Sequence, residues 1–160
     1  MWQKIMDGVT AGMVAGAAGT TALNAVTYAD MALRGRPTSR TPERSVEIIA
    51  DRIGLSVPGE GAARDNRLTG LGALSGIATG VAIGAALGGL RAIGLRLPPR
   101  AGTPLVAAAA MVATDLPMAR IGVSDPRTWS AADWLSDLIP HLAYAAVSCA
   151  TLEALDRKRR

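Results

Sequence analysis

The chain has 160 residues and a formal net charge of +4; 49% of its residues are hydrophobic and only 19% are charged. It has no Phe, three Trp and two Tyr, so it lacks the large aromatic side chains that supply much of the buried area of a water-soluble core. Its basic residues gather where apolar segments end and do not form a face interleaved with aromatics, which argues against nucleic-acid binding. Length and composition therefore predict one membrane-embedded helical domain, residues 1–160.

The first predicted element is a membrane-spanning helix over about residues 8–33. Its apolar body is barely long enough to cross a hydrocarbon core of ~30 Å at ~1.5 Å per residue. The sequence Arg-Gly-Arg-Pro at residues 34–37 ends it. Glycine recurs at every fourth position within this helix, at Gly8, Gly12 and Gly16.

A short helix over residues 42–53 is predicted next. Thr41 is the expected N-cap, Pro42 suits the first helical position, and Glu43 suits the positive end of the helix dipole. The apolar residues of this segment share one face: Val46, Ile49, Ala50 and Ile53. The segment is too short and too charged to span, so we expect an amphipathic helix that lies on the membrane interface or docks on the bundle.

Residues 68–90 contain no charge and form the clearest predicted span. Five glycines recur there at a spacing of four: Gly72, Gly76, Gly80, Gly84 and Gly88. Such a glycine zipper of GxxxG steps lets two helix backbones approach until van der Waals and weak Cα–H···O contacts form. Two interpretations follow: the first two spans pack on each other, or one glycine strip faces another copy of the protein or another subunit.

The last two spans are predicted over residues 103–120 and 131–155, and the sequence from Ser130 to Asp133 is a candidate capping box for the second of them. Both spans are less typical of membrane helices, because Asp115 lies in one and Asp137 and His141 lie in the other. Either span is therefore a candidate for partial insertion.

Six residues form a candidate polar or proton-binding cluster: Asn24, Asp30, Asp115, Asp137, His141 and Tyr144. A charged side chain deep in a bilayer costs a few kcal/mol, so intramembrane carboxyls should face the bundle interior and be paired or protonated. Asp137 and His141 are four residues apart and share a helical face. This pair is interpreted as a hydrogen-bonded clasp at Pro140, as a proton-accepting pair that lines a path, or as an interfacial group exposed to solvent.

The sequence predicts no metal site and no cofactor, because it contains a single His and a single Cys. No phosphate loop or dinucleotide fingerprint follows a strand, and the spacing around Ser136 and Ser148 does not fit a nucleophile elbow. Cys149 has no partner for an intramolecular disulfide. A membrane-embedded enzyme is therefore only the third-ranked hypothesis, and the protein is not predicted to be an enzyme.

Residues 125–129 and 134–144 resemble the closing part of small bacterial inner-membrane proteins of the YagU-like kind. The shared pattern is D-x-x-P-H-x-x-Y, which Asp137, Pro140, His141 and Tyr144 match. The resemblance covers about twenty residues at the C-terminal end and, more loosely, the Gly-rich first helix. It implies a small helical membrane protein in which these four residues act as a unit, and it implies no biochemical activity.

The sequence thus predicts an all-α integral membrane bundle of about four spanning helices plus one interfacial helix. The leading functional hypothesis is a protein that acts through helix packing, as a homo-oligomer or as an accessory subunit of a membrane complex. The alternative is a small transporter or proton-conducting protein that uses Asp115, Asp137 and His141. Expected partners are membrane lipids, other copies of the chain or other membrane subunits. The expected location is the bacterial inner membrane with cytoplasmic termini, although basic residues are nearly equal on the two sides.

Overall fold

The computed structural model describes residues 1–158, apart from the side chains of residues 99 and 100. Arg159 and Arg160 of the basic tail lie outside the described residues. The helices are α1 (Trp2–Arg34), α2 (Thr41–Arg52), α3 (Gly61–Ala92), α4 (Pro99–Arg120), a 3-10 turn η1 (Pro126–Thr128), and α5 (Ala131–Lys158). No strand occurs within the described residues. The prediction of an all-α fold with four long helices and one short helix is confirmed.

Four helices are long and apolar enough to cross a membrane: α1, α3, residues 101–120 of α4, and α5. In their most apolar stretches only 11% to 33% of the residues are buried inside the fold. Most of the apolar side chains therefore face outward, where lipid rather than water must surround them. Trp2 is 74% exposed near one end of α1 and Tyr28 is 61% exposed near the other, as is typical of side chains at the two membrane surfaces. The chain is a multi-pass membrane protein.

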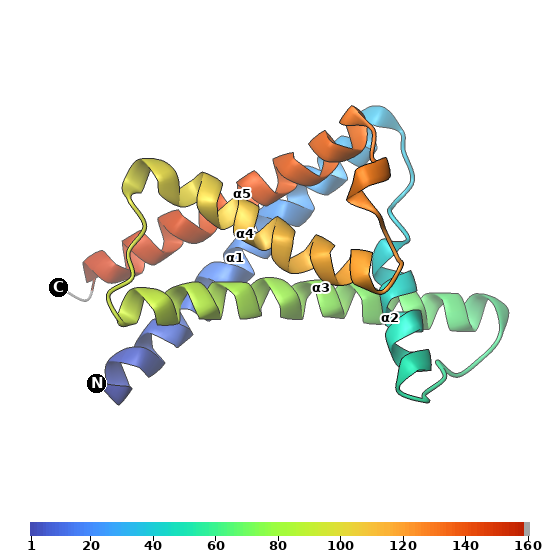
Figure 1. Cartoon of the computed structure of the whole chain (residues 1–160), viewed down its shortest axis with the longest axis horizontal. Coiled ribbons are helices and arrows are strands. Elements are labelled where there is room, and N and C mark those ends of the chain that lie inside the picture. Colours follow the sequence, from blue (N-terminus) through green and yellow to red (C-terminus); the bar gives the residue numbers. More distant parts are fainter. Residues whose placement is uncertain (159–160) are drawn as a thin grey trace.

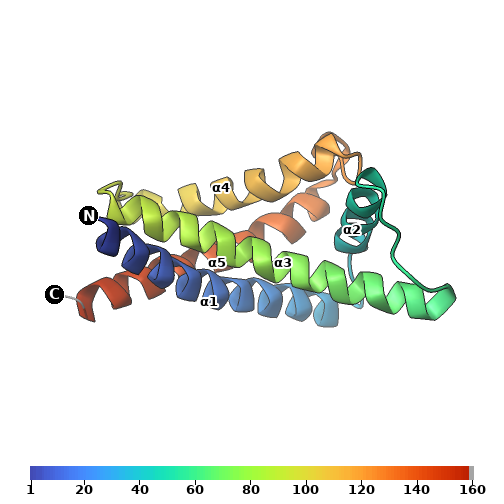
Figure 2. The ribbon, with the colours of Figure 1, turned by 90° about the horizontal axis from the view of Figure 1, so that it is seen from below.

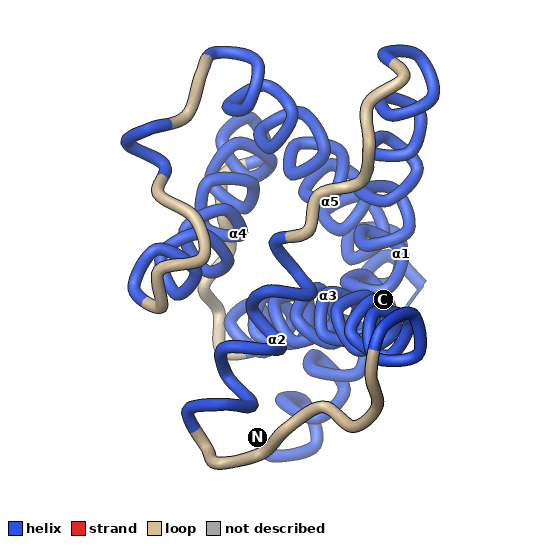
Figure 3. The backbone as a smooth tube through the Cα atoms, turned by 90° about the vertical axis from the view of Figure 1, so that its right-hand side faces the viewer, coloured by secondary structure: helices blue, strands red, loops and turns tan. Residues whose placement is uncertain are grey.

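The N-terminus, the C-terminus and the α3–α4 connection lie at one end of the bundle, and α2 and the α4–α5 connection lie at the other (Figure 1). Helix α1 packs on both α3 and α5, whereas α4 packs on α5 and hardly touches α3. Figure 2 shows α2 beside the N-terminal half of α3. In the end-on view, α4 lies at the side of the bundle next to α5 (Figure 3). Helix α4 is thus held mainly by one neighbour.

The helices begin and end close to the predicted bounds, and the largest difference is at α3. This helix starts at Gly61, two turns before the apolar run that begins at residue 68. The added turns contain Arg64, Asp65 and Arg67, which hydropathy alone assigns to a loop. Helical residues need not be apolar where the helix leaves the lipid, so the hydrophobic stretch marks the membrane and not the helix end.

Three helices end in the same glycine motif. Gly54, Gly94 and Gly122 follow α2, α3 and α4 with φ angles of 72°, 100° and 81°, a region that glycine enters without steric cost. After each glycine, the N–H of a hydrophobic residue bonds a carbonyl five residues back: Leu55 to Ala50, Leu95 to Leu90, and Val123 to Met118. This is the Schellman arrangement, which satisfies carbonyls that the helix end leaves unpaired.

One of the two predicted N-caps is confirmed and one is wrong. At α5, the Ser130 hydroxyl accepts the N–H of Asp133 at 3.2 Å, and the Asp133 carboxylate accepts the N–H of Ser130 at 2.9 Å. At α2, Arg40 is the cap residue and Thr41 is already helical. The Ser39 hydroxyl accepts the N–H of Thr41 at 3.2 Å, so the polar group that serves this helix start comes from outside the helix.

Six of the eight glycines that recur at a spacing of four lie in the seam between α1 and α3. A Cβ on Gly8 would lie 2.6 Å from the Cβ of Ala92, one on Gly16 would lie 2.5 Å from the carbonyl oxygen of Gly80, and one on Gly84 would lie 2.5 Å from the Cα of Gly16. Gly12 and Gly88 also face each other across this seam. No side chain fits there, so the two backbones are in direct contact.

The other two glycines of this spacing, Gly72 and Gly76, do not face α1. A Cβ on Gly72 would lie 3.0 Å from Pro42 of α2, and one on Gly76 would meet nothing within 4 Å. Four residues turn a helix by about 400°, so the glycine strip rotates by about 40° at each step. Over the length of α3 this rotation carries the strip from α1 toward α2 and the surface.

Candidate functional site

The six residues predicted as one polar cluster separate into distinct groups. Asp115, Asp137 and His141 lie together where α4 meets α5. Tyr144 is on the same helix as His141 but bonds α3. Asp30 pairs with arginines that follow it in the chain. Asn24 is half-buried in α1 and makes no side-chain hydrogen bond to any described residue.

The centre of the candidate site is a pair of carboxyl groups. Asp115 of α4 and Asp137 of α5 lie close enough across the seam to interact electrostatically. The Oδ2 atom of Asp137 is buried, and no described donor bonds it. Two carboxylates held close together in a site of low dielectric repel each other, and a proton on one of them relieves this repulsion. The pair is therefore suited to hold one proton between its two members.

His141 completes the site from the same helix as Asp137. Its side chain is 11% exposed, and its Nδ1 lies 2.8 Å from the carbonyl oxygen of Asp137 and 3.4 Å from the Oδ1 of Asp137. A carbonyl oxygen only accepts, so Nδ1 carries the hydrogen of this bond. The other ring nitrogen, Nε2, is then the atom at which the imidazole gains or loses a proton.

The site lies within two candidate membrane-spanning helices, close to the end of each. Asp115 is about five residues before the end of α4, and Asp137 is about six residues after the start of α5. At ~1.5 Å per residue these positions are roughly 8 to 9 Å along each helix from the α4–α5 connection. The carboxyl pair is thus one to two turns from the helix ends, on the side of the bundle that carries the α4–α5 connection.

One side of the site is open. Asp115 lines an open groove of about 700 Å³ on α4, between this helix and the residues that connect it to α5. The groove wall is mainly apolar, with Met111, Leu116 and Val123 among its residues, and Trp134 of α5 lies at its edge. Asp115 therefore borders the groove on one side and faces Asp137 of α5 on the other.

The rim of the groove carries an ion pair that is neutral as a whole. Arg127 donates from Nε and from a terminal nitrogen to Asp125, at 2.9 and 2.8 Å. These hydrogen bonds hold the pKa of the Asp125 carboxyl below its usual value. Nearby, Trp129 packs edge-on against Trp134 with ring centroids 5.0 Å apart, and its Nε1 donates to the Ser124 hydroxyl at 3.0 Å. These contacts hold the α4–α5 connection in place where it borders the groove.

Further along α5, Tyr144 and Ser148 join three helices. The Tyr144 hydroxyl donates to the carbonyl of Gly80 in α3 at 2.7 Å, and the Ser148 hydroxyl donates to the carbonyl of Ala15 in α1 at 3.2 Å. Both side chains are buried. A Cβ on Gly19 of α1 would lie 2.8 Å from Tyr144, so the phenol ring occupies the space that glycine leaves. The hydroxyls of Tyr144 and Ser148 therefore hold α5 against α3 and α1.

Ser148 was missed as a partner in sequence reasoning, although a signal for it exists. Asp137, His141, Tyr144 and Ser148 follow one another at steps of four, three and four residues, which places them on one helical face. An uninterrupted polar stripe on an otherwise apolar helix indicates a face turned toward the other helices. The groove gave no such signal, because the chain connection that forms its wall has no periodicity.

Asp30 belongs to the membrane surface and not to the site. Its carboxylate pairs with Nε of Arg36 and lies 3.5 Å from Arg34. Arg34 also donates to the Ser136 hydroxyl of α5 at 3.1 Å. These contacts tie the end of α1 to the start of α5, next to the Asp115–Asp137 pair.

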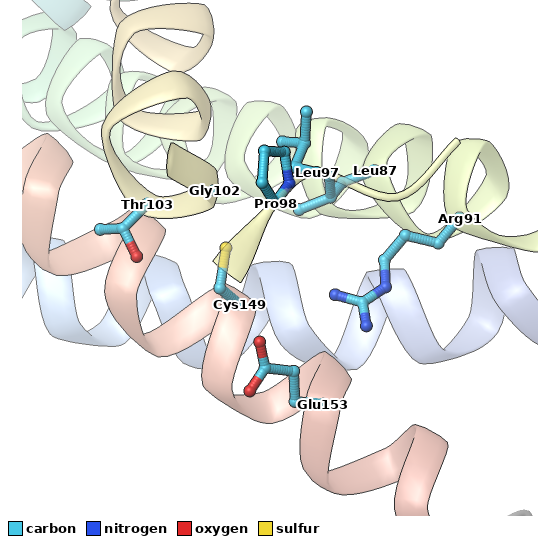
Figure 4. Close-up of a pocket in the computed structure, with 8 residues that line it drawn as sticks. All are labelled: Leu87, Arg91, Leu97, Pro98, Gly102, Thr103, Cys149 and Glu153. Carbon is cyan, nitrogen blue, oxygen red and sulfur yellow. The ribbon is translucent and has the colours of Figure 1, made fainter. Parts of the chain in front are cut away.

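A second polar group lies at the opposite end of the bundle. Arg91 of α3 pairs with Asp156 of α5 at 2.8 Å. Beside this pair is a cavity of about 50 Å³, around which Arg91, Thr103, Cys149 and Glu153 are arranged (Figure 4). This volume has room for one or a few water molecules. Among the described residues, no three His, Cys, Asp or Glu side chains are arranged to hold a metal ion.

Comparisons of the chain with known protein families, with curated proteins and with solved structures found no match.

Proposed function

We propose that the protein is a small proton-conducting or proton-coupled transport protein that binds its proton at Asp115, Asp137 and His141. One observation carries this proposal: two carboxyl groups of different helices meet inside a membrane-spanning bundle, beside an imidazole and at the wall of an open groove. Ionisable groups within spanning segments are costly and mark ion or proton pathways in many membrane proteins.

The order of the groups suggests the direction of proton uptake. Asp115 is the member that contacts the groove, so a proton reaches it first and is then shared with Asp137. His141 lies beyond them and is buried, with 9% of the residue exposed. Beyond His141, the hydroxyls of Tyr144 and Ser148 are already bonded to backbone carbonyls. Passage across the membrane therefore requires a shift at the α4–α5 seam.

Helix α4 is the element most suited to make that shift. It packs on α5 and hardly touches α3, so the α4–α5 seam is its main attachment. When the carboxyl pair holds a proton, a hydrogen bond joins the two helices; when both carboxyls are ionised, they repel each other. Proton binding and the position of α4 are thereby coupled.

Proton flux into liposomes tests this proposal. Purified protein in liposomes with an internal pH-sensitive dye should acidify the lumen when the outside is acidified, with valinomycin and K⁺ to balance charge. Asp115→Asn and His141→Ala should each reduce this flux severalfold, whereas Asp65→Asn, an exposed carboxyl on α3, should leave it unchanged. Wild-type protein that acidifies the lumen no faster than empty liposomes would contradict the proposal.

The alternative function, assembly through helix packing, has support from α3. Residues 73–79 of α3 are exposed, and a Cβ on Gly76 would meet no neighbour within 4 Å. Small residues on a lipid-facing surface favour close approach of another helix. Under this hypothesis Gly76→Leu should lower the oligomer mass measured in lipid nanodiscs or release a co-purifying subunit. An unchanged mass and unchanged co-purification would exclude this surface.

We also propose a bacterial inner-membrane location with cytoplasmic termini and kinship with YagU-like proteins. The basic end of α5, Arg157 and Lys158, favours a cytoplasmic C-terminus. In support of kinship, Asp137, His141 and Tyr144 of the shared pattern lie on the interior side of α5. A reporter fused to the C-terminus, active only in the cytoplasm, tests the orientation.

A further inference from the structure

We propose that the groove beside Asp115 binds a lipophilic cation, an organic ion with an apolar body and one positive charge, in exchange for a proton. This inference rests on the proposed function and names the class of molecule that would be coupled to the proton.

The shape and lining of the groove indicate an apolar ligand. Its volume of about 700 Å³ falls within the range of small-molecule sites, roughly 300 to 1,000 Å³. Met111, Val112 and Leu116 of α4 present apolar side chains to it, and Val123 closes it from the connection. Such walls stabilise apolar surface by removing it from water.

The charges around the groove select a cation. Asp115 is the carboxyl at its wall, and Asp137 lies directly behind it. Arg127, the basic residue of the rim, is already paired with Asp125 through two nitrogens. The ring of Trp134, which is 44% exposed at the groove edge, adds an aromatic surface of the kind that attracts cations. An anion would meet repulsion from the carboxyl pair and find no free partner in this rim.

The groove is also placed where such a molecule would arrive. It lies on α4, the helix at the side of the bundle (Figure 3), and extends from Asp115 to the connection at the membrane surface. Lipophilic cations partition into membranes and concentrate below the headgroups. A ligand can therefore enter from the lipid without crossing the helix bundle.

The exchange balances in charge and in protons. In the absence of the cation, the Asp115–Asp137 pair holds one proton. When the cation binds, the O–H bond of that carboxyl breaks, the proton leaves to water through the groove, and the carboxylate pairs with the cation. Among the described residues, the ionisable groups that face Asp115 are Asp137 and His141 of α5, with Asp125 and Arg127 at the rim. His141 is the proton acceptor that lies next to the pair, and Asp125 is already paired with Arg127.

Binding of tetraphenylphosphonium tests the site, with tetraphenylborate as an anion of the same shape. Protein in lipid nanodiscs, compared with empty nanodiscs, should bind the phosphonium ion and not the borate. Asp115→Asn should weaken phosphonium binding by about tenfold or more, Asp115→Glu should restore most of it, and Asp65→Asn should have no effect. Equal binding of both ions, or equal phosphonium binding by wild type and Asp115→Asn, would overturn the inference.

Proton release separates this inference from the proposed function. In weakly buffered solution, phosphonium binding to wild-type protein should release up to one proton per bound ion, and binding without any release would overturn the exchange. If the protein conducts protons into liposomes but does not bind phosphonium, this inference fails and the proposed function stands. If it binds phosphonium at Asp115 but moves no protons, the proposed function fails while the site remains.

Discussion

The hydroxyl of Tyr144 in α5 donates a hydrogen bond of 2.7 Å to the main-chain carbonyl of Gly80 in α3. That carbonyl is accessible to a side chain because Gly80 carries no side chain of its own. A Cβ there would overlap the hydroxyl oxygen of Thr20 and lie 3.5 Å from the Tyr144 ring. Gly80 thus takes part in the close contact between α1 and α3, and its carbonyl oxygen accepts the hydrogen bond from Tyr144 of α5.

Replacing Tyr144 by Phe should destabilise the bundle by about 0.5 to 1.5 kcal/mol, the usual net contribution of one hydrogen bond. The ring remains in place, so packing against Gly19 is preserved. Reversible unfolding in mixed lipid and SDS micelles measures the change. Tyr28→Phe is the matched control because Tyr28 is exposed. Equal effects of the two substitutions would show that the Gly80 hydrogen bond contributes nothing.

Gly84→Ala and Gly76→Ala should have opposite effects, although both add one methyl group to the same helix. At Gly84 the methyl would overlap the backbone of Gly16, and forcing the helices apart should cost about 1 to 3 kcal/mol. At Gly76 it meets open space, and Ala favours the helix by up to about 1 kcal/mol. The same unfolding assay compares them, and a loss of stability at both positions would place a partner on Gly76.

Ser130→Ala should destabilise the start of α5 by about 1 kcal/mol, because the N–H of Asp133 loses its acceptor. Local opening should appear as faster amide hydrogen exchange in the first turn of α5. Ser56→Ala, in the exposed α2–α3 connection, is the control. Unchanged exchange in the first turn would show that the capping box does not hold this helix end.

Asp125 should titrate below an ordinary aspartate, and Arg127→Gln should move its pKa up toward about 3.9. A lowered pKa means that the ion pair stabilises the folded connection above about pH 4, and that this contribution is lost as pH falls through the lowered pKa. Carbon-13 NMR of the labelled carboxyl measures both titrations. Identical pKa values in wild type and variant would exclude Arg127 as the cause.

The long helices could be predicted because their apolar runs match the thickness of a membrane, and the glycine spacing indicated that backbones approach closely. Which backbones meet could not be predicted from spacing alone. Gly72 and Gly76 continue the pattern of Gly80 but point away from α1, because the strip rotates around α3. That outcome depends on the relative placement of α1 and α2, which is a tertiary property.

The candidate site was partly predictable for a similar reason. Asp137 and His141 share a helical face in any α-helix, so their proximity follows from the sequence. The approach of Asp115 depends on how α4 packs on α5, and Asp30 was misplaced because arginines after the helix end turn back to reach it. Local spacing fixes neighbours within one helix, whereas contacts between helices require the fold.

Helix α3 has 32 residues and is about 48 Å long at ~1.5 Å per residue, well above the ~30 Å of a hydrocarbon core. Its charged first turns therefore stand in the headgroup layer and the water beyond. Arg64 in these turns binds Glu47 of α2 at 2.7 Å. This ion pair attaches the short helix α2 to the N-terminal turns of α3. The two ends of the bundle consequently differ. One end presents α2 and the charged first turns of α3 to the aqueous phase, and the other presents the termini and the short α3–α4 connection.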